Sequence, residues 1–271
     1  MKFHDSTQAI ELSYEFENSM FKYPSDEEPS FERTKAKEEE IKQGIYCESR
    51  TLLGESSSIK YYSGRVKFNN TYNHQGTHID APAHKFTDGR TIDSYPPLKF
   101  FNSCALVDLT GTELLKRERR EIRLEDIEPW FKECRYLDKL GALIFYTGFC
   151  DEMHANNGKL SSEEKKCFEK TFPFFSIPAA NYIVERKPDL NIVGIDSFSV
   201  DPSGSNSEVH RIFFSRDILL LETLYNLLEL KQKNGKKAFG LISYPPKYKH
   251  FDAAPTGVLA ILSEDETRKF T

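Results

Sequence analysis

Three histidines and an aspartate lie within one eleven-residue stretch of this chain, which has only seven histidines among its 271 residues. The stretch reads His74-Gln-Gly-Thr-His78-Ile-Asp80-Ala-Pro-Ala-His84. Neutral imidazole and carboxylate are the ligands that borderline divalent cations such as Zn²⁺ and Mn²⁺ accept. A lone histidine would most simply be a surface or hydrogen-bonded residue, but four candidate ligands at this spacing predict a metal site. His84 could be a ligand, a general acid/base beside the metal, or a residue that orients a ligand.

The spacing of these residues favours an extended segment over a helix. His74 and His78 would share a helical face, but Gly76 weakens a helix and Pro82 disfavours the helical region for Ala81. In an extended segment the side chains alternate between two faces. One face would then carry all four candidate ligands, because the residues on it are His74, Gly76, His78, Asp80, Pro82 and His84.

A second pair of candidate ligands lies further along the chain. Glu222 ends the apolar run that begins at Leu219, and His210 precedes it by twelve residues. A carboxylate at the end of an apolar strand is costly to bury unless it is paired or binds a metal. Taken alone, Glu222 could equally reach solvent or pair with an arginine, so this pair only supports the first motif.

The composition is that of a globular protein, with 38% hydrophobic and 29% charged residues. We expect one domain over residues 1–271, with residues 1–60 partly an N-terminal arm. A net charge of −5 gives no sign of the excess of basic residues that is typical of proteins that bind nucleic acid. The beginning of the chain lacks the apolar core of a signal peptide, and no apolar run approaches membrane-spanning length. Five cysteines without Cys-x-x-Cys spacing are typical of reduced thiols. A cytoplasmic protein is therefore predicted.

The pattern of apolar residues predicts a mixed α/β fold. Strands are expected at residues 9–16, 60–70, 105–109, 142–146, 191–196, 217–222, 238–243 and 258–262. Helices are expected at residues 124–137 and 178–187, and another should begin after Ser161, which can cap it. Residues 23–29 have the proline and acidic content of a loop, and the charged run 35–42 is expected to be solvated.

The motif from His74 to His84 resembles the signature of the cyclase-like metal-dependent hydrolases, which include bacterial kynurenine formamidases and isatin hydrolases. Further segments resemble the family in order and spacing. These are residues 14–24, Tyr146-Thr-Gly-Phe149, Gly194-Ile-Asp-Ser-Phe-Ser-Val-Asp201, and the pair His210 and Glu222. The resemblance extends from about residue 12 to residue 261.

This resemblance implies a swivelling β/β/α fold with mixed sheets and flanking helices, in a homodimer or homotetramer. It implies that His74, His78 and Asp80 bind a first metal, and that Asp80 bridges to a second held by His210 and Glu222. His84 would be the acid/base histidine. The ion would be Zn²⁺ or Mn²⁺, with one or two per chain, although iron accepts the same ligands.

The activity implied is hydrolysis of a non-peptide carbon–nitrogen bond in a small molecule, as in an arylformamidase of tryptophan catabolism. Two positions depart from the family pattern, because Tyr146 and Gly257 stand where arginines are usual. Without them an anionic substrate would lose a bidentate partner. Two alternatives therefore stay open: a hydrolase of a cyclic amide or lactone, and a metal-binding homologue without catalysis.

Overall fold

The computed structural model describes residues 8–13, 30–35, 64–69, 73–156 and 159–262. The chain divides into two compact units, a larger one of residues 1–16, 20–26 and 72–271 and a smaller one of residues 17–19 and 27–71. The expectation of one domain with a partial arm over residues 1–60 stays a prediction, because most of that arm lies outside the described residues. The resemblance noted over residues 14–24, the loop at 23–29 and most of the charged run at 35–42 also lie outside them.

The described part of the smaller unit is an antiparallel pair of strands, β2 (Ser30–Lys35) and β3 (Gly64–Asn69). Ser30 pairs with Asn69, and Lys35 pairs with Gly64. Strand β3 confirms the strand predicted at residues 60–70. The pairing partner β2 was not predicted, because its sequence carries charges and no apolar run.

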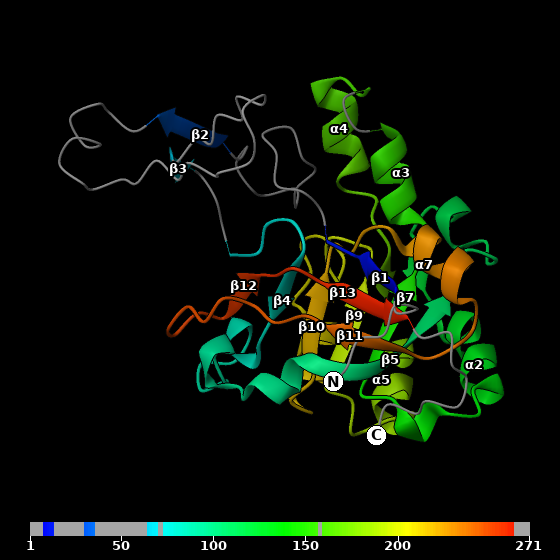
Figure 1. Cartoon of the computed structure of the whole chain (residues 1–271). Coiled ribbons are helices and arrows are strands. Elements are labelled where there is room, and N and C mark those ends of the chain that lie inside the picture. Colours follow the sequence, from blue (N-terminus) through cyan, green and yellow to red (C-terminus); the bar gives the residue numbers. More distant parts are fainter. Residues whose placement is uncertain (1–7, 14–29, 36–63, 70–72, 157–158, 263–271) are drawn as a thin grey trace, which may run out of the picture. The chain divides into compact units, whose positions relative to one another are not determined.

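In the described part of the larger unit, nine strands form one mixed sheet in the order β1-β13-β11-β5-β7-β9-β10-β4-β12 (Figure 1). Its strands are β1 (Gln8–Glu11), β4 (His78–Asp80), β5 (Phe101–Asp108), β7 (Ala142–Tyr146), β9 (Ile192–Ile195), β10 (Leu219–Glu222), β11 (Phe239–Ile242), β12 (Ala253–Pro255) and β13 (Leu259–Leu262). Strands β5, β7, β9 and β10 are parallel, and antiparallel strands extend the sheet on both sides. The predicted mixed α/β class is confirmed.

Strand β7 shows why the apolar runs form the centre of this sheet. All five of its residues are buried. Leu143 and Phe145 pack into one hydrophobic cluster, while Ala142, Ile144 and Tyr146 pack into another. Because side chains alternate along a strand, a continuous apolar run can fill the core on both faces of a sheet.

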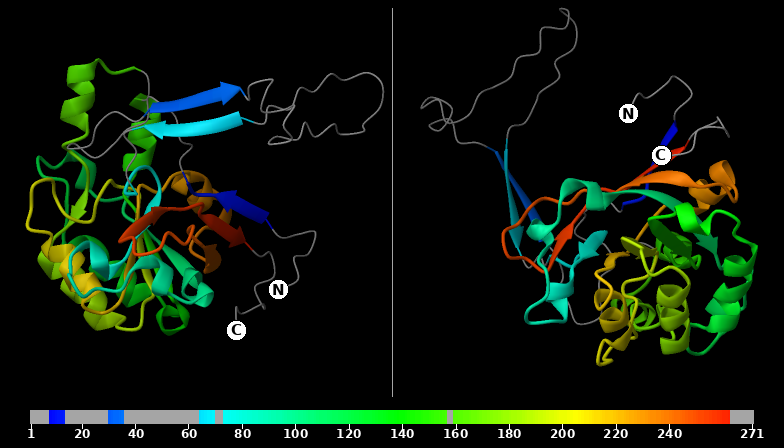
Figure 2. Two further views of the ribbon diagram at one scale, coloured as in Figure 1. Left: turned by 90° about the vertical axis from the view of Figure 1, so that its left-hand side faces the viewer. Right: turned by 90° about the horizontal axis from the view of Figure 1, so that it is seen from below.

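Helices lie against the sheet (Figure 2). Their apolar residues enter both hydrophobic clusters. The described helices are α2 (Leu124–Glu133), α3 (Phe149–Asn156), α4 (Ser162–Phe168), α5 (Ile177–Arg186), α6 (Glu208–Phe214) and α7 (Leu227–Asn234). Apolar residues of α2, α5 and α6 enter the cluster that contains Phe145, and those of α3 and α7 enter the other. None of the described helices is long and apolar enough to cross a membrane.

Local signals account for several helix boundaries. Ser161 and Glu164 cap each other at the start of α4, as predicted from the Ser161 motif. Asp196, directly after β9, accepts hydrogen bonds from the backbone nitrogens of Thr147, Gly148 and Cys150 at the start of α3. The Thr-Gly element after β7 is thereby joined to the strand beside it.

The structure also differs from the predicted elements. Helix α2 ends at Glu133, four residues before the predicted end, because Cys134 is extended and Leu137 is buried by a separate 3-10 turn. Helices α3, α6 and α7 and strand β12 were not predicted. Strand β12 has only three residues, Ala-Ala-Pro, which carry no alternating pattern.

Candidate metal centre

Backbone pairing between three short strands brings the candidate ligands together. Strand β4 lies between β10 and β12, and both pairings are antiparallel. In this register Glu222 lies opposite His78, and Asp80 lies opposite Ala253. His78, Asp80 and Glu222 are at most 3% exposed. The Glu222 carboxylate, at the end of β10, therefore lies beside the histidine motif, at the edge of the parallel part of the sheet.

The expectation that the whole motif is extended is wrong. Only His78–Asp80 is a strand, Gly76 has a positive φ of 64°, and Pro82–His84 forms a 3-10 turn. Proline fixes its own φ near the helical value and holds the preceding residue extended. The chain therefore turns sharply after Ala81 and folds His84 back. His84 joins the other candidate ligands because of this turn and not because one straight strand presents the whole motif.

His78 points its Nε2 nitrogen toward two carboxylates. Its Nδ1 lies 2.8 Å from the carbonyl oxygen of Gly76, which can only accept, so Nδ1 carries the hydrogen. In the neutral ring Nε2 is then a lone pair, and it lies 3.3 Å from Asp80 Oδ1 and 3.4 Å from Glu222 Oε2. Among the described residues, His78 Nε2 and both Asp80 oxygens are buried without a hydrogen-bond partner. Three converging acceptors of this kind are the arrangement that a cation stabilises.

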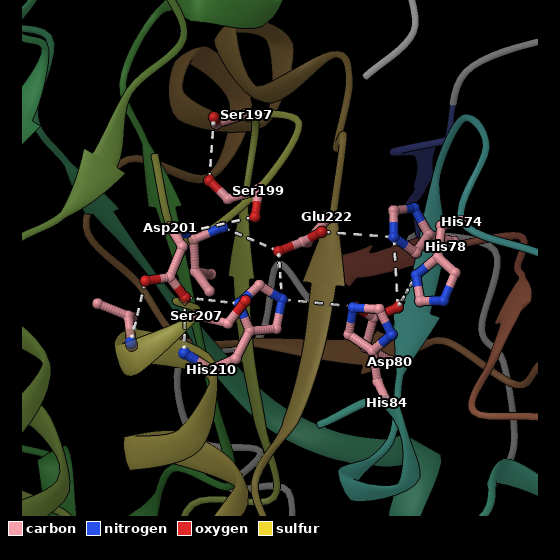
Figure 3. Close-up of polar contacts among 12 residues, drawn as sticks. His74, His78, Asp80, His84, Ser197, Ser199, Asp201, Ser207, His210 and Glu222 are labelled. Carbon is pink, nitrogen blue, oxygen red and sulfur yellow. Dashed lines mark hydrogen bonds and ion pairs between the residues drawn. The ribbon is translucent and has the colours of Figure 1, made fainter. Parts of the chain in front are cut away.

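His210 reaches the same space from helix α6. Its Nδ1 lies 2.6 Å from Asp201 Oδ2, so Nε2 faces the centre, 3.7 Å from Asp80 Oδ2 and 3.6 Å from Glu222 Oε1. Figure 3 shows these side chains directed toward one another from β4, β10 and α6. A carboxylate that fixes the tautomer of a ligating histidine is a common partner of metal ligands.

His74 and His84 complete the cluster, together with an aspartate that the sequence analysis missed. His74 Nδ1 lies 3.0 Å from Asp80 Oδ1. Asp252 Oδ2 lies 3.1 Å from His74 Nε2 and 2.9 Å from His84 Nδ1. Asp252 directly precedes β12 and lies 168 residues after His84 in the chain. Its only signal in the sequence was that it lies five residues before Gly257, a position already compared with the family pattern.

The charges of the cluster shift the pKa values of its members. Burial lowers the pKa of His74, but the carboxylates of Asp80 and Asp252 outweigh it and raise the pKa to about 10. Burial acts likewise on His210, whose pKa is raised to about 9 by Asp201 and Asp80. Burial would raise the pKa of Asp80, yet the surrounding imidazoles hold it below its usual range. The carboxylates of the cluster are therefore stable in their ionised form when positive charge, from protonated imidazoles or a metal ion, lies beside them.

The donor separations match those around a single ion. Nitrogen and oxygen donors about 2.1 Å from a tetrahedral ion lie about 3.4 Å from one another. His78 Nε2 lies 3.3 Å from Asp80 Oδ1 and 3.4 Å from Glu222 Oε2. His74, His78 and Asp80 offer ligand atoms that all lie within 4.8 Å of one another, and so do Asp80, His84 and His210. The cluster can hold a metal ion.

Other polar residues near the cluster form hydrogen bonds with the protein itself. The Thr77 hydroxyl donates to the Thr223 carbonyl at 2.6 Å, and Asp196 caps α3. Of the segment 196–201, Asp201 is therefore the residue that orients an imidazole. At the two positions that depart from the family pattern, the Tyr146 hydroxyl donates to Asp151. No other described heavy atom would come within 4 Å of a Cβ placed on Gly257.

Fold and site together define a mixed α/β protein with a cluster of imidazoles and carboxylates able to hold a metal. Residues 10–202 match the model of the Cyclase family, which is more than half of the chain. The chain belongs to this family. His210, Glu222 and Asp252 lie beyond the matched residues.

Two proteins are similar to this chain over part of its length. A kynurenine formamidase of Bacillus cereus is 26% identical over 153 residues, which cover 56% of this chain and 60% of that protein. A protein of Haemophilus influenzae, described as uncharacterized, is 29% identical over 123 residues, covering 45% of this chain and 76% of that protein.

Solved structures share the fold. The structure of a "potential metal-dependent hydrolase with cyclase activity" has a TM-score of 0.64 at 21% identity, and covers 96% of this chain and 100% of that one. Isatin hydrolase A from Labrenzia aggregata has a TM-score of 0.69 at 16% identity, and covers 96% of this chain and 95% of that one.

Proposed function

We propose that this protein is a metal-dependent hydrolase that cleaves a carbon–nitrogen bond of a small amide, in the manner of a kynurenine formamidase. The observation that carries the proposal is the convergence of two imidazole nitrogens, Nε2 of His78 and Nε2 of His210, with the buried carboxylates of Asp80 and Glu222. The relationship to a named kynurenine formamidase supports an aryl formamide as the first substrate to test.

The proposed ligands are those of the sequence analysis. His74, His78 and Asp80 would hold one ion, and Asp80, His210 and Glu222 a second. A bound Zn²⁺ or Mn²⁺ would polarise the amide carbonyl and make hydroxide available near neutral pH. Asp201 keeps the hydrogen of His210 on Nδ1, and the Gly76 carbonyl does the same for His78. Both Nε2 atoms therefore face the centre of the cluster, where an ion would take the place of the hydrogen that the neighbouring carboxylates favour there.

His84 is the proposed general acid/base. It lies at the edge of the cluster with a side chain 21% exposed, and its ring centroid is 5.4 Å from that of His210. Its Nδ1 is engaged by Asp252, so Nε2 is the atom free to move a proton. A proton delivered to the leaving nitrogen would let the amide bond break.

A second candidate is hydrolysis of a cyclic amide or lactone, supported by the shared fold with isatin hydrolase A. Tyr146 and Gly257 favour this candidate, because neither can offer an anionic substrate the bidentate contact of an arginine. The third candidate, a metal-binding homologue without catalysis, would keep the ligands and turn over nothing. A cytoplasmic homodimer or homotetramer with no nucleic-acid or membrane partner remains part of the proposal.

The test is a substrate panel with protein loaded separately with Zn²⁺ or Mn²⁺. We expect hydrolysis of N-formylkynurenine, with kcat lowered about 10²–10⁴-fold in His84→Ala. His154→Ala is the matched control, because His154 contacts Tyr225 and belongs to no cluster described above. Turnover of isatin or a lactone but not of the formamide would favour the second candidate. Metal binding without turnover of any of them would contradict the proposal.

A further inference from the structure

Asp252, like Asp80, touches two imidazoles of the motif through a single oxygen, and its pair of imidazoles includes His84. Its Oδ2 lies 3.1 Å from His74 Nε2 and 2.9 Å from His84 Nδ1. Its Oδ1 accepts a hydrogen bond from Asn73 Nδ2 at 2.6 Å. With both oxygens engaged, the carboxylate plane is held in place.

The contacts of Asp252 decide where the ring hydrogens lie. An ionised carboxylate can only accept, so the facing nitrogens, His74 Nε2 and His84 Nδ1, each carry a hydrogen. Asp252 is the carboxylate paired with His84 among the described residues, so the neutral His84 ring has its lone pair on Nε2. His74 Nδ1 faces a second carboxylate, Asp80 Oδ1, at 3.0 Å, so without an ion both nitrogens of His74 carry a hydrogen. An ion at Nδ1 would take the place of that hydrogen, while Asp252 would keep the other on Nε2. His74 is thus positioned as a ligand and His84 as a base.

The backbone places Asp252 with the same precision as the ligands. The Ala81 amide donates to the Asp252 carbonyl at 2.8 Å, and Ala253 pairs with Asp80 in the ladder between β12 and β4. The ring centroids of His74 and His84 lie 4.1 Å apart, close enough for one carboxylate oxygen to serve both. A carboxylate delivered by a neighbouring strand can therefore set both rings at once.

We propose that Asp252 is a positioning residue that sets the tautomers of His74 and His84 together, and so links metal binding to proton transfer. Its effect on His74 concerns the affinity for the ion. Its effect on His84 rests on the proposed function, because only a hydrolase would use that ring to move a proton. In this proposal Asp252 acts through the two imidazoles and is not itself a ligand, although its carboxylate forms a group with His74 and His84 that could also hold an ion.

The tautomers can be measured without any substrate. We would label the histidines with ¹⁵N, load the protein with Zn²⁺ and assign the His84 ring by its loss in His84→Gln. In the unaltered protein the hydrogen of His84 should be on Nδ1. In Asp252→Asn it should move to Nε2, because the amide nitrogen of asparagine can donate to Nδ1. A His84 ring with its hydrogen on Nε2 in the unaltered protein, or unchanged in Asp252→Asn, would overturn the proposal.

The affinity for the ion gives a second readout. Loss of a carboxylate that orients a ligating histidine typically weakens metal binding 10–100-fold. We expect a decrease of about this size for Zn²⁺ in Asp252→Asn, measured by competition with a chromophoric chelator. Asp93→Asn is the matched control, because Asp93 accepts from the His250 backbone in the same loop and touches no imidazole of the cluster. An equal loss in Asp93→Asn would assign the effect to loop displacement and contradict the proposal.

Kinetics separate this inference from the proposed function. At saturating Zn²⁺, kcat of Asp252→Asn should fall to the level of His84→Ala with little change in KM, and the double variant should lose no more. Full kcat in Asp252→Asn would overturn the link to His84. If the unaltered protein hydrolyses nothing, the proposed function fails, and the tautomers and the Zn²⁺ affinity still decide the role of Asp252.

Discussion

Asp80 is the residue on which the metal centre depends. It is fully buried, and the ionic partners found for it among the described residues are imidazoles: His74, His78 and His210. Its Oδ1 faces His74 and His78, while Oδ2 faces His210. A carboxylate with one oxygen on each side is suited to bridging two ions about 3.5–4 Å apart.

We therefore expect Asp80→Ala to abolish metal binding. The substitution removes the one group shared by both sets of proposed ligands, so neither set keeps three. Metal content per chain would be measured by elemental analysis after equilibration with Zn²⁺, with near-ultraviolet circular dichroism to show that the variant is folded. If it is not, Asp80→Asn replaces it and should at least halve the metal content. Full stoichiometry in either variant would contradict the shared carboxylate.

The 3-10 turn Pro82–His84 is the element that decides where His84 lies. Its geometry depends on a close backbone approach, since a Cβ on Gly89 would lie 2.4 Å from the carbonyl carbon of Pro82 and 2.5 Å from the Ala83 nitrogen. The Ala83 amide also donates to the Arg90 carbonyl at 3.1 Å. The loop from the turn to Arg90 is therefore closed on itself, with glycine at its tightest point.

Gly89→Ala should displace this turn. We expect it to lower the free energy of unfolding by about 1–3 kcal/mol through overpacking, and to lower kcat as His84 moves from Asp252. Urea unfolding and turnover would be measured together. Gly111→Ala is the matched control, because no described atom would lie within 4 Å of its new Cβ, and it should change stability by about 0.5 kcal/mol or less. Equal stability of the two variants would show that the approach is not tight in solution.

Apolar periodicity predicted the central strands well, and this is the part of the fold set by local pattern. Strand β7 was predicted with its observed bounds, and β9, β10, β11 and β13 to within two residues at either end. Helices α6 and α7 were missed, because a Ser/Asn-rich loop precedes α6 and α7 is short and mostly polar. Burial against the sheet, and not intrinsic propensity, holds such short helices.

At the scale of the whole molecule, the metal centre joins segments of the larger unit that are distant in sequence. Strands β4 and β10 and helix α6 each contribute a candidate ligand, and Asp252, directly before β12, contacts two of the histidines. An ion bound there would tie these segments together in the folded state only. Ligands that bind only the folded state stabilise it in proportion to the logarithm of their concentration.

Removing the metal should therefore lower Tm. At an ion concentration about 100 times Kd the contribution is about 2.7 kcal/mol, which corresponds to a shift of roughly 5–10 °C for a unit of this size. Thermal unfolding would be followed with Zn²⁺ and after exhaustive treatment with a chelator, which is then removed. The difference should disappear in Asp80→Ala. A Tm that does not respond to the chelator would mean that no ion contributes to the folded state.

The amino-acid sequence alone determined the kind of chemistry, because imidazoles and carboxylates at close spacing are set by residue type: His74, His78, Asp80, His84, and at a distance His210 and Glu222. The central strands and the mixed α/β class followed from the same local patterns. Only the tertiary structure decided that the motif bends after Ala81, and that Asp252 closes on His74 and His84 from 178 and 168 residues away. Antiparallel pairing between distant strands creates such contacts, and it leaves no periodic trace near either partner.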